Sequence, residues 1–305
     1  MTFCAKGLYT AMITPFTSYG ELDEEGLRQN IKLQVASGVD GLVVLGTTGE
    51  VPTLSDEERV RIISITVKEV KGKIPVIVGT GCYSTRETIA NGRQAVSLGA
   101  DALLVVTPYY NRPSQEGLYE HFKAVAENNE LPIILYNVPG RTGVNLHVET
   151  VKRLASVPRI VGIKECSGQM SQVNAMMESV VRQHSHFTLL SGDDILTFPL
   201  MTLGAHGIIS VVSNLIPQKM KQLVSLIEEG NYAAARELHY QLTPLFVGAA
   251  IETNPTPIKA AMQLRGMAAG GCRLPLASLL PENQQQLETV LQKIGGMDGT
   301  AQSED

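Results

Sequence analysis

The chain has 305 residues, of which 44% are hydrophobic and 18% are charged, and its formal net charge is -5 at pH 7. This balance excludes a disordered chain, and it argues against a nucleic-acid partner because such proteins usually carry a basic stripe. The longest apolar runs, such as 102–106 and 133–136, are much shorter than the ~18 residues that a membrane-spanning helix needs. The first residues lack the pattern of a signal peptide, so we expect a cytoplasmic protein without membrane contact.

Strand-length apolar runs alternate with amphipathic helical stretches from the first residues onward. The eight predicted pairs of strand and helix are 8–14 with 24–36, 41–47 with 55–70, 75–80 with 84–98, 102–107 with 114–127, 132–137 with 147–155, 160–165 with 171–182, 187–192 with 195–203, and 206–212 with 217–228. The strand runs are continuous and rich in β-branched residues, as in a parallel sheet covered on both faces. Eight such units without a linker favour a closed (β/α)8 barrel over two doubly wound domains.

Three more helical stretches follow the eighth unit, at 231–250, 257–267 and 281–294. A barrel does not require them, so we expect a C-terminal helical extension. The predicted division is a catalytic barrel over residues 1–229, a helical subdomain over 230–294 and a disordered tail over 295–305. The tail prediction follows from its small, polar and acidic residues.

The four cysteines, Cys4, Cys82, Cys166 and Cys272, lie far apart in the chain. They form no CxxC pair, and no histidines stand at the spacing of zinc ligands. We therefore expect four free thiols and no metal site.

One lysine, Lys164, stands at the carboxyl end of the predicted strand 160–165. Residues two apart in a strand share a face, so Gly162 and Lys164 point one way and Glu165 points the other. If the lysine faces the barrel interior, Gly162 leaves space beside its stem, and apolar surroundings lower the pKa of the amine. A lysine of this kind can form a Schiff base. The alternative is a strand-end lysine that reaches into solvent.

Polar residues gather at the other strand ends, where a barrel of this kind builds its active site. The segment GTTGE at 46–50 offers two hydroxyls and backbone amides that suit a carboxylate or phosphate oxygen, unless it is only a capped turn. Tyr109, Tyr110 and Tyr136 can each relay a proton or simply pack in the core. Arg141 can grip a carboxylate with its planar fork, although a surface arginine would look the same in sequence.

Five segments together resemble a known family. They are GTTGE at 46–50, TPYYNRPSQEGL at 107–118, YNVPGRTG at 136–143, GIKECSG at 162–168 and GDD at 192–194. The chain resembles the pyruvate-dependent class I aldolase family of N-acetylneuraminate lyase and dihydrodipicolinate synthase over essentially its whole length, and it is closest to the synthase branch. The resemblance implies a homotetramer, a dimer of dimers, that joins pyruvate to aspartate semialdehyde on the route to diaminopimelate and lysine.

The resemblance also implies a mechanism without a cofactor or a metal, in which Lys164 forms a covalent imine with pyruvate. Tyr136 would transfer protons, linked to Thr48 and to Tyr110, and the latter would reach into the site of a neighbouring subunit. A protonated imine is itself an electron sink, so the carbanion needs no metal to stabilise it.

The same resemblance implies a set of substrate contacts around the lysine. Thr47 and Thr48 would bind the carboxylate of pyruvate, and Arg141 the carboxylate of the semialdehyde. Gly192 and Ile209 would be backbone positions near the lysine.

Two other functions remain open on the sequence alone. One is a sibling aldolase of the N-acetylneuraminate lyase or 2-keto-3-deoxy acid type, which would use the same lysine with a different aldehyde. The other is an inactive relative that binds a small keto acid. Arg141 and the segment PYYNRPSQEGL favour the synthase branch over the siblings.

A regulatory site for lysine, found at a subunit interface in many synthases of this family, is only partly matched here. Tyr109 and Glu87 are retained, and a phenol with a carboxylate can hold an ammonium group. Asp56 and Arg59 stand where histidines or aromatic residues would be expected, and Tyr83 replaces an asparagine that would meet the carboxylate of the ligand. We therefore expect lysine to inhibit weakly or not at all.

Overall fold

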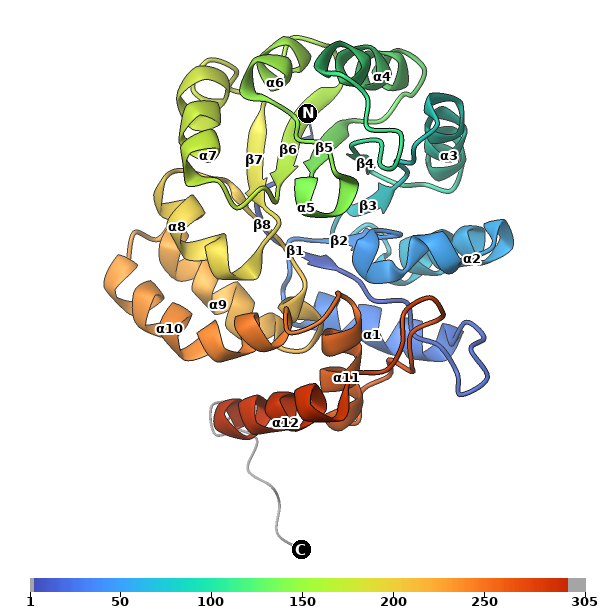
Figure 1. Ribbon diagram of the computed structural model, residues 1–305, viewed down its shortest axis with the longest axis vertical. Coiled ribbons are helices and arrows are strands. Elements are labelled where there is room, and N and C mark those ends of the chain that lie inside the picture. Colours follow the sequence, from blue (N-terminus) through green and yellow to red (C-terminus); the bar gives the residue numbers. More distant parts are fainter. Residues whose placement is uncertain (1–2, 296–305) are drawn as a thin grey trace, which may run out of the picture.

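The computed structural model describes residues 3–295, and within that range eight parallel strands close into a barrel in sequence order (Figure 1). The strands are β1 (Gly7–Ala11), β2 (Gly41–Val44), β3 (Val76–Gly79), β4 (Ala102–Val106), β5 (Ile133–Asn137), β6 (Ile160–Glu165), β7 (Thr188–Ser191) and β8 (Gly207–Ser210). The predicted (β/α)8 barrel is confirmed. Predicted strands 8–14 and 206–212 are longer than the observed β1 and β8, because their last residues continue into loops at the carboxyl end of the barrel.

Helices surround the barrel, and each predicted helix is present with ends shifted by a few residues at most. The surrounding helices are α1 (Glu24–Ala36), α2 (Asp56–Val70), α3 (Thr85–Ser97), α4 (Gln115–Glu127), α5 (Pro139–Thr142), α6 (Val148–Leu154), α7 (Met170–Met176), α8 (Thr197–Thr202) and α9 (Pro217–Glu228). Serine caps begin several of them, and Ser55 forms a full capping box with Glu58 at the start of α2. Two details differ from the prediction: the short α5 is additional, and the stretch 171–182 divides into α7 and a π-helical turn over Met177–Val181.

The strands are buried on both faces, which explains their continuous apolar sequence. One cluster of buried residues fills the barrel interior and includes Tyr9, Ile77, Leu104, Tyr136 and Ile209. A larger cluster lies between the outer face of the sheet and the helices. The barrel is therefore a packed core, and only its carboxyl end is left for a site.

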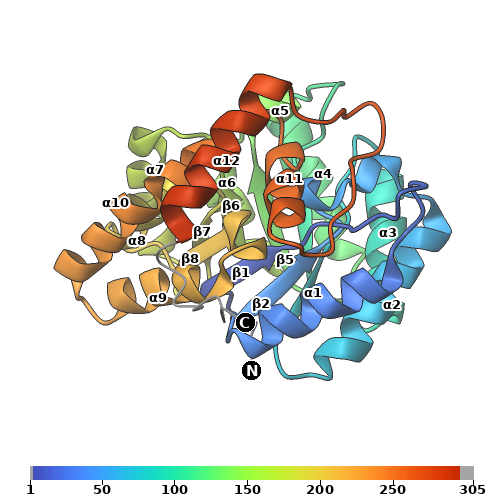
Figure 2. The same cartoon turned by 90° about the horizontal axis from the view of Figure 1, so that it is seen from below.

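The C-terminal extension consists of α10 (Tyr232–Gly248), α11 (Thr256–Leu264) and α12 (Pro281–Gly295). Figures 1 and 2 show the three helices side by side against the α9 and α1 side of the barrel. Leu242, Leu245 and Leu287 belong to the same hydrophobic cluster as the outer barrel residues, so the extension shares its core with the barrel. The division at residue 230 stays a prediction. The predicted tail lies outside the described residues except for Gly295, which ends α12.

In the described range, the longest helix has 17 residues, and none combines the length and apolar character needed to cross a membrane.

A buried ion pair joins the extension to the loop that follows β2. The Nζ atom of Lys259 in α11 lies 2.7 Å from Oε1 of Glu50, and both side chains are at most 1% exposed. The amine also donates to the carbonyl oxygens of Thr14 and Gly271, while Oε2 of Glu50 accepts from the backbone N–H of Arg273. With its partners satisfied in this way, the pair holds three distant segments together.

We expect Lys259→Met to lower the free energy of unfolding by about 3–5 kcal/mol, because Glu50 would keep a buried charge without a partner. Urea denaturation at pH 7 measures the change. The double variant Lys259→Met, Glu50→Gln removes both charges and should recover most of the loss. Equal losses in the single and double variants would contradict a role for charge pairing.

Candidate active site

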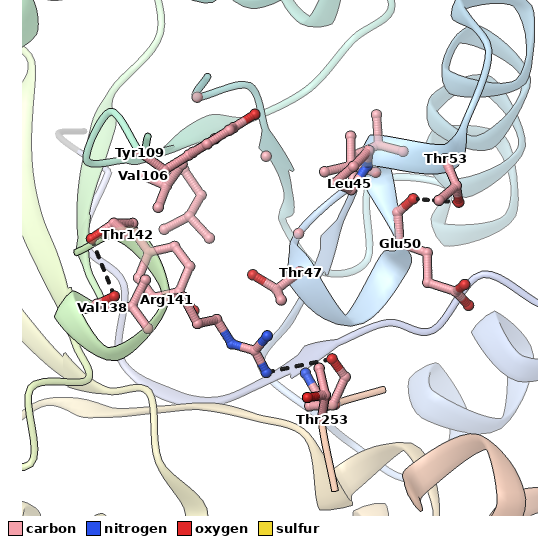
Figure 3. Close-up of a pocket in the computed structure, with 18 of the residues that line it drawn as sticks. Leu45, Thr47, Glu50, Thr53, Val106, Tyr109, Val138, Arg141, Thr142 and Thr253 are labelled. Atoms are coloured by element: carbon pink, nitrogen blue, oxygen red, sulfur yellow. Dashed lines mark hydrogen bonds between the residues drawn. The ribbon is translucent and has the colours of Figure 1, made fainter. Parts of the chain in front are cut away.

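A cavity of about 310 Å³ lies at the carboxyl ends of β2 to β5. Its polar wall comes from the loop after β2, from α5 and from the segment before α11, and includes Thr47, Arg141, Thr253 and Asn254. Figure 3 shows the Arg141 side chain crossing the cavity from α5, with its guanidinium between Thr47 and the Thr253 segment. Tyr136 forms part of the inner wall, on the barrel side.

Lys164 lies on β6 directly opposite Tyr136 on β5, because the two residues are register partners in the parallel ladder. Its Nζ lies 4.4 Å from the centroid of the Tyr136 ring, and the residue is only 5% exposed. Burial lowers the pKa of the amine, and the negative charge of Asp194 acts in the opposite direction. The alternative of a solvent-facing lysine is therefore wrong.

Glu165, the next residue, points to the other face of β6 as predicted. Its carboxylate accepts hydrogen bonds from Nδ2 of Asn137 at 3.0 Å and from the backbone N–H of Ser167 at 2.6 Å. The carboxylate that is nearest in sequence is thus engaged elsewhere.

The glycine that makes room for the lysine stem is Gly192, and the prediction for Gly162 is wrong. A Cβ atom on Gly162 would lie 2.5 Å from Oγ1 of Thr188 on β7, so that space is already filled from the next strand. A Cβ atom on Gly192 would lie 2.6 Å from Cε of Lys164 and would also collide with the thiol of Cys166. The sequence predicted that a glycine on the same strand as Lys164 leaves space for the lysine stem. The space is left instead by Gly192, which directly follows β7.

The hydroxyl of Tyr136 lies among polar groups that the sequence identified only in part. Burial raises the pKa of the phenol, and the neighbouring hydroxyl of Thr47 acts in the opposite direction. The thiol of Cys166 is a further neighbour, and burial raises its pKa to about 12. The predicted link from Tyr136 to Thr48 stays a prediction, since the described hydrogen bonds join the Tyr136 hydroxyl to neither Thr47 nor Thr48. The Thr48 hydroxyl instead accepts from Nδ2 of Asn254 at 3.0 Å.

The two threonines lie in a short 3₁₀ turn, Thr47–Gly49, between two residues of left-handed backbone conformation. Leu45 has φ 57° and Glu50 has φ 54°. Each such residue costs roughly 1–2 kcal/mol for a side chain other than glycine. The buried contacts of Glu50 with Lys259 and Arg273 hold this loop in its strained shape.

Arg141 projects from α5 into the cavity, and its Nη2 donates to the backbone carbonyl of Asn254 at 3.4 Å. The guanidinium has no carboxylate partner among the described residues, so its fork can receive an anionic ligand.

A buried carboxylate, Asp194, was not assigned a role from the sequence, although it belongs to the GDD segment. It accepts hydrogen bonds from Oγ of Ser210 at 2.5 Å and from the backbone N–H groups of Val211 at 2.9 Å and Val212 at 3.2 Å. Burial raises its pKa to about 6. The charge of this carboxylate raises the pKa of Lys164. The pair of adjacent aspartates at a strand end is the sequence feature from which a role for Asp194 could have been predicted.

Several predicted residues do not line the cavity within one chain, namely Lys164, Thr48, Gly192, Ile209 and Tyr110. Ile209 lies on β8 with its side chain in the barrel interior. Tyr110 is 91% exposed with φ 71°, so its ring does not reach Tyr136. Asn254 and Cys166 were missed; Cys166 follows Lys164 at strand spacing, whereas no pattern in the sequence singles out Asn254.

The predicted regulatory residues lie beside the cavity rather than in it, except for Tyr109. The rings of Tyr83 and Tyr109 are perpendicular with centroids 5.5 Å apart. Arg59 lies 3.4 Å from the carboxylate of Asp56 and donates to the carbonyl of Val51 at 3.2 Å. Arg59 and Tyr109 also line a small cavity of about 60 Å³, whereas Glu87 is 3.6 Å from the thiol of Cys82.

The four cysteines are free thiols. Among residues 3–295, no three histidine, cysteine, aspartate or glutamate side chains come together as metal ligands would.

These features define a class of protein: a (β/α)8 barrel enzyme with a desolvated lysine at the end of its sixth strand. The sequence model of the dihydrodipicolinate synthetase family matches residues 4–294, and the chain belongs to that family. The resemblance seen in the five sequence segments is thereby confirmed.

Individual relatives agree over nearly the whole chain. The chain is 52% identical to a 4-hydroxy-tetrahydrodipicolinate synthase of Protochlamydia amoebophila, over 95% of this chain and 96% of the relative. It is 47% identical to an enzyme of the same name from Thermotoga neapolitana, over 95% and 99% of the two chains. The crystal structure of dihydrodipicolinate synthase from Thermotoga maritima superposes with a TM-score of 0.94 at 44% identity, covering 96% of this chain and 99% of that chain.

We expect Gly192→Ala to lower the free energy of unfolding by about 1–3 kcal/mol and to displace the stem of Lys164. Reductive methylation with formaldehyde and borohydride, read by peptide mass, should then modify Lys164 at a changed rate. Gly162→Ala is the matched control, since its added methyl meets Thr188 instead. If the rate of Lys164 methylation changed equally in both variants, Gly192 would not be the glycine that leaves space for the lysine stem.

We expect Asp194→Asn to lower the pKa of Lys164 further, because the ionised carboxylate raises it. More of the amine is then neutral at a given pH, so the rise of methylation with pH should move to lower pH. The difference should vanish below about pH 6, where Asp194 is itself protonated. Asp193→Asn is the control and should move the profile much less, because Asp193 acts on the pKa of Asp194 and not directly on that of Lys164. A shift to higher pH in Asp194→Asn would contradict the argument.

Proposed function

We propose that this protein condenses pyruvate with aspartate semialdehyde to 4-hydroxy-tetrahydrodipicolinate, the first committed step toward diaminopimelate and lysine. The observation that carries the proposal is the buried amine of Lys164 against the ring of Tyr136, which lines the same cavity as Arg141. This arrangement suits a keto acid bound covalently and a second anionic substrate held above it. Membership in the synthetase family and the names of its relatives support the same reaction.

Lys164 starts the reaction, because its lowered pKa leaves more of the amine neutral and nucleophilic. The amine adds to the ketone carbon of pyruvate, and loss of water gives a protonated imine. The imine nitrogen withdraws electrons, so a methyl proton can leave to form an enamine, whose carbon attacks the aldehyde. The product then cyclises through its own amino group and leaves Lys164 as the free amine, without a cofactor.

Tyr136 is the proposed proton carrier for these steps. Because burial raises its pKa, the phenol stays protonated and can donate a proton while it accepts another. Thr47 is its proposed hydroxyl partner in this chain, in place of Thr48. Thr47 and Thr48 together are proposed to bind the carboxylate of pyruvate, near the backbone of Gly192 and Ile209.

Arg141 is proposed to bind the carboxylate of the semialdehyde with its fork. Tyr110, exposed in one chain, is proposed to complete the site of a neighbouring subunit. We therefore propose a homotetramer built as a dimer of dimers in the cytoplasm. One structural relative, 44% identical with a TM-score of 0.93, is described as a monomeric dihydrodipicolinate synthase variant.

The test is to incubate the protein with pyruvate and borohydride and to weigh the tryptic peptides, then to assay turnover with aspartate semialdehyde. We expect one pyruvate-derived group per chain on Lys164, and none in Lys164→Ala. Arg141→Ala should trap pyruvate normally but use the semialdehyde poorly. Modification of Lys259 would contradict the mechanism, and trapping followed by turnover with a different aldehyde would assign a sibling aldolase.

We also predict that lysine does not reach half-inhibition at submillimolar concentration when both substrates are saturating. Arg59 is already engaged by Asp56 and by a backbone carbonyl, and Tyr83 offers no amide to a ligand carboxylate. A lysine titration of turnover measures this. Tyr83→Asn should increase sensitivity; strong inhibition of the unmodified protein would show that these residues form the site in another geometry.

A further inference from the structure

Asn254 connects the two groups that are proposed to bind the two substrates. Its Nδ2 donates to the hydroxyl of Thr48 at 3.0 Å, and its backbone carbonyl accepts from Nη2 of Arg141 at 3.4 Å. The residue lines the cavity although it belongs to the segment between α10 and α11, far from both partners in sequence.

The hydrogen bond to Thr48 has a direction, and that direction matters for binding an anion. A hydroxyl has one proton to donate and lone pairs that accept. Because the amide of Asn254 donates to the Thr48 oxygen, the single hydroxyl proton remains available for another acceptor. A carboxylate accepts hydrogen bonds only, so it needs this proton.

We propose that Asn254 is a positioning residue that directs the hydroxyl proton of Thr48 toward the carboxylate of the keto acid. The inference rests on the proposed function, and it adds the C-terminal extension to the residues that determine keto-acid affinity. Asn254 acts through Thr48 and does not itself touch the reacting atoms.

The surroundings hold Asn254 in place. Two residues further on, α11 begins, and its Lys259 is paired with Glu50 at 2.7 Å. Glu50 lies two residues after Thr48, so the donor and the acceptor of the hydrogen bond are both anchored by one buried ion pair. An anchored partner loses little conformational freedom when the substrate binds.

The test measures the pyruvate concentration that half-saturates borohydride trapping on Lys164, which needs no second substrate. We expect Asn254→Ala to raise this concentration roughly five- to tenfold, the size of one neutral hydrogen bond. Asn254→Asp keeps the shape of the side chain, but its carboxylate would accept the hydroxyl proton of Thr48. We expect this variant to raise the half-saturating pyruvate concentration roughly ten- to a hundredfold. Gln263→Ala is the control and should have no effect, since this exposed residue of α11 does not line the cavity and its side chain makes no hydrogen bond among the described residues.

A double-mutant cycle separates positioning from a general structural role. In a Thr48→Val background, Asn254→Ala should change half-saturation by less than about twofold, because the two residues act as a unit. Full additivity, or an Asn254→Asp variant milder than Asn254→Ala, would overturn the proposal. Failure of the unmodified protein to trap pyruvate on Lys164 would instead overturn the proposed function, so the two failures are distinguishable.

Discussion

The site depends on the cost of keeping one amine out of water. Burying a charged ammonium costs several kcal/mol, so a lysine that is 5% exposed is pushed toward its neutral and nucleophilic form. The neighbouring carboxylates are arranged so that they do not cancel this effect. Glu165 is turned to the other face of β6, and Asp194 is held by one hydroxyl and two backbone N–H groups. The apolar interior of the barrel therefore both stabilises the fold and sets the reactivity of Lys164.

A second buried charge has the opposite function, because it is fully paired. Lys259 and Glu50 neutralise each other and hold the loop that carries Thr47 and Thr48. That loop contains two residues in left-handed conformation, which an unsupported chain would relax. These two buried lysines thus have different roles. Among residues 3–295 the amine of Lys164 has no ion-pair partner, whereas Lys259 is paired with Glu50 and stabilises the strained loop in the cavity wall.

Most of the fold and the central lysine could be predicted from the sequence, because both depend on patterns within short stretches of residues. Continuous apolar runs mark the strands, and strand periodicity places Lys164 on the face opposite to Glu165. The packing around the lysine could not be predicted, since it depends on contacts between separate strands and loops. The space for the lysine comes from Gly192 at the end of another strand. The loop after Leu45 leaves strand geometry, so periodicity cannot show that Thr47 is the neighbour of Tyr136.

The position of Asn254 has a consequence for how the protein is made. Its contact with Thr48 spans 206 residues and the pair of Lys259 with Glu50 spans 209, so these are among the last contacts that a growing chain can form. Domains emerge from the ribosome amino terminus first, and contacts of large sequence separation form slowly. A nascent chain therefore contains Lys164 and Tyr136 before the part of the cavity wall that includes Asn254 has been synthesised. Synthesis of the last helices completes the site, and a truncated chain carries the reactive lysine without the wall that shapes its cavity.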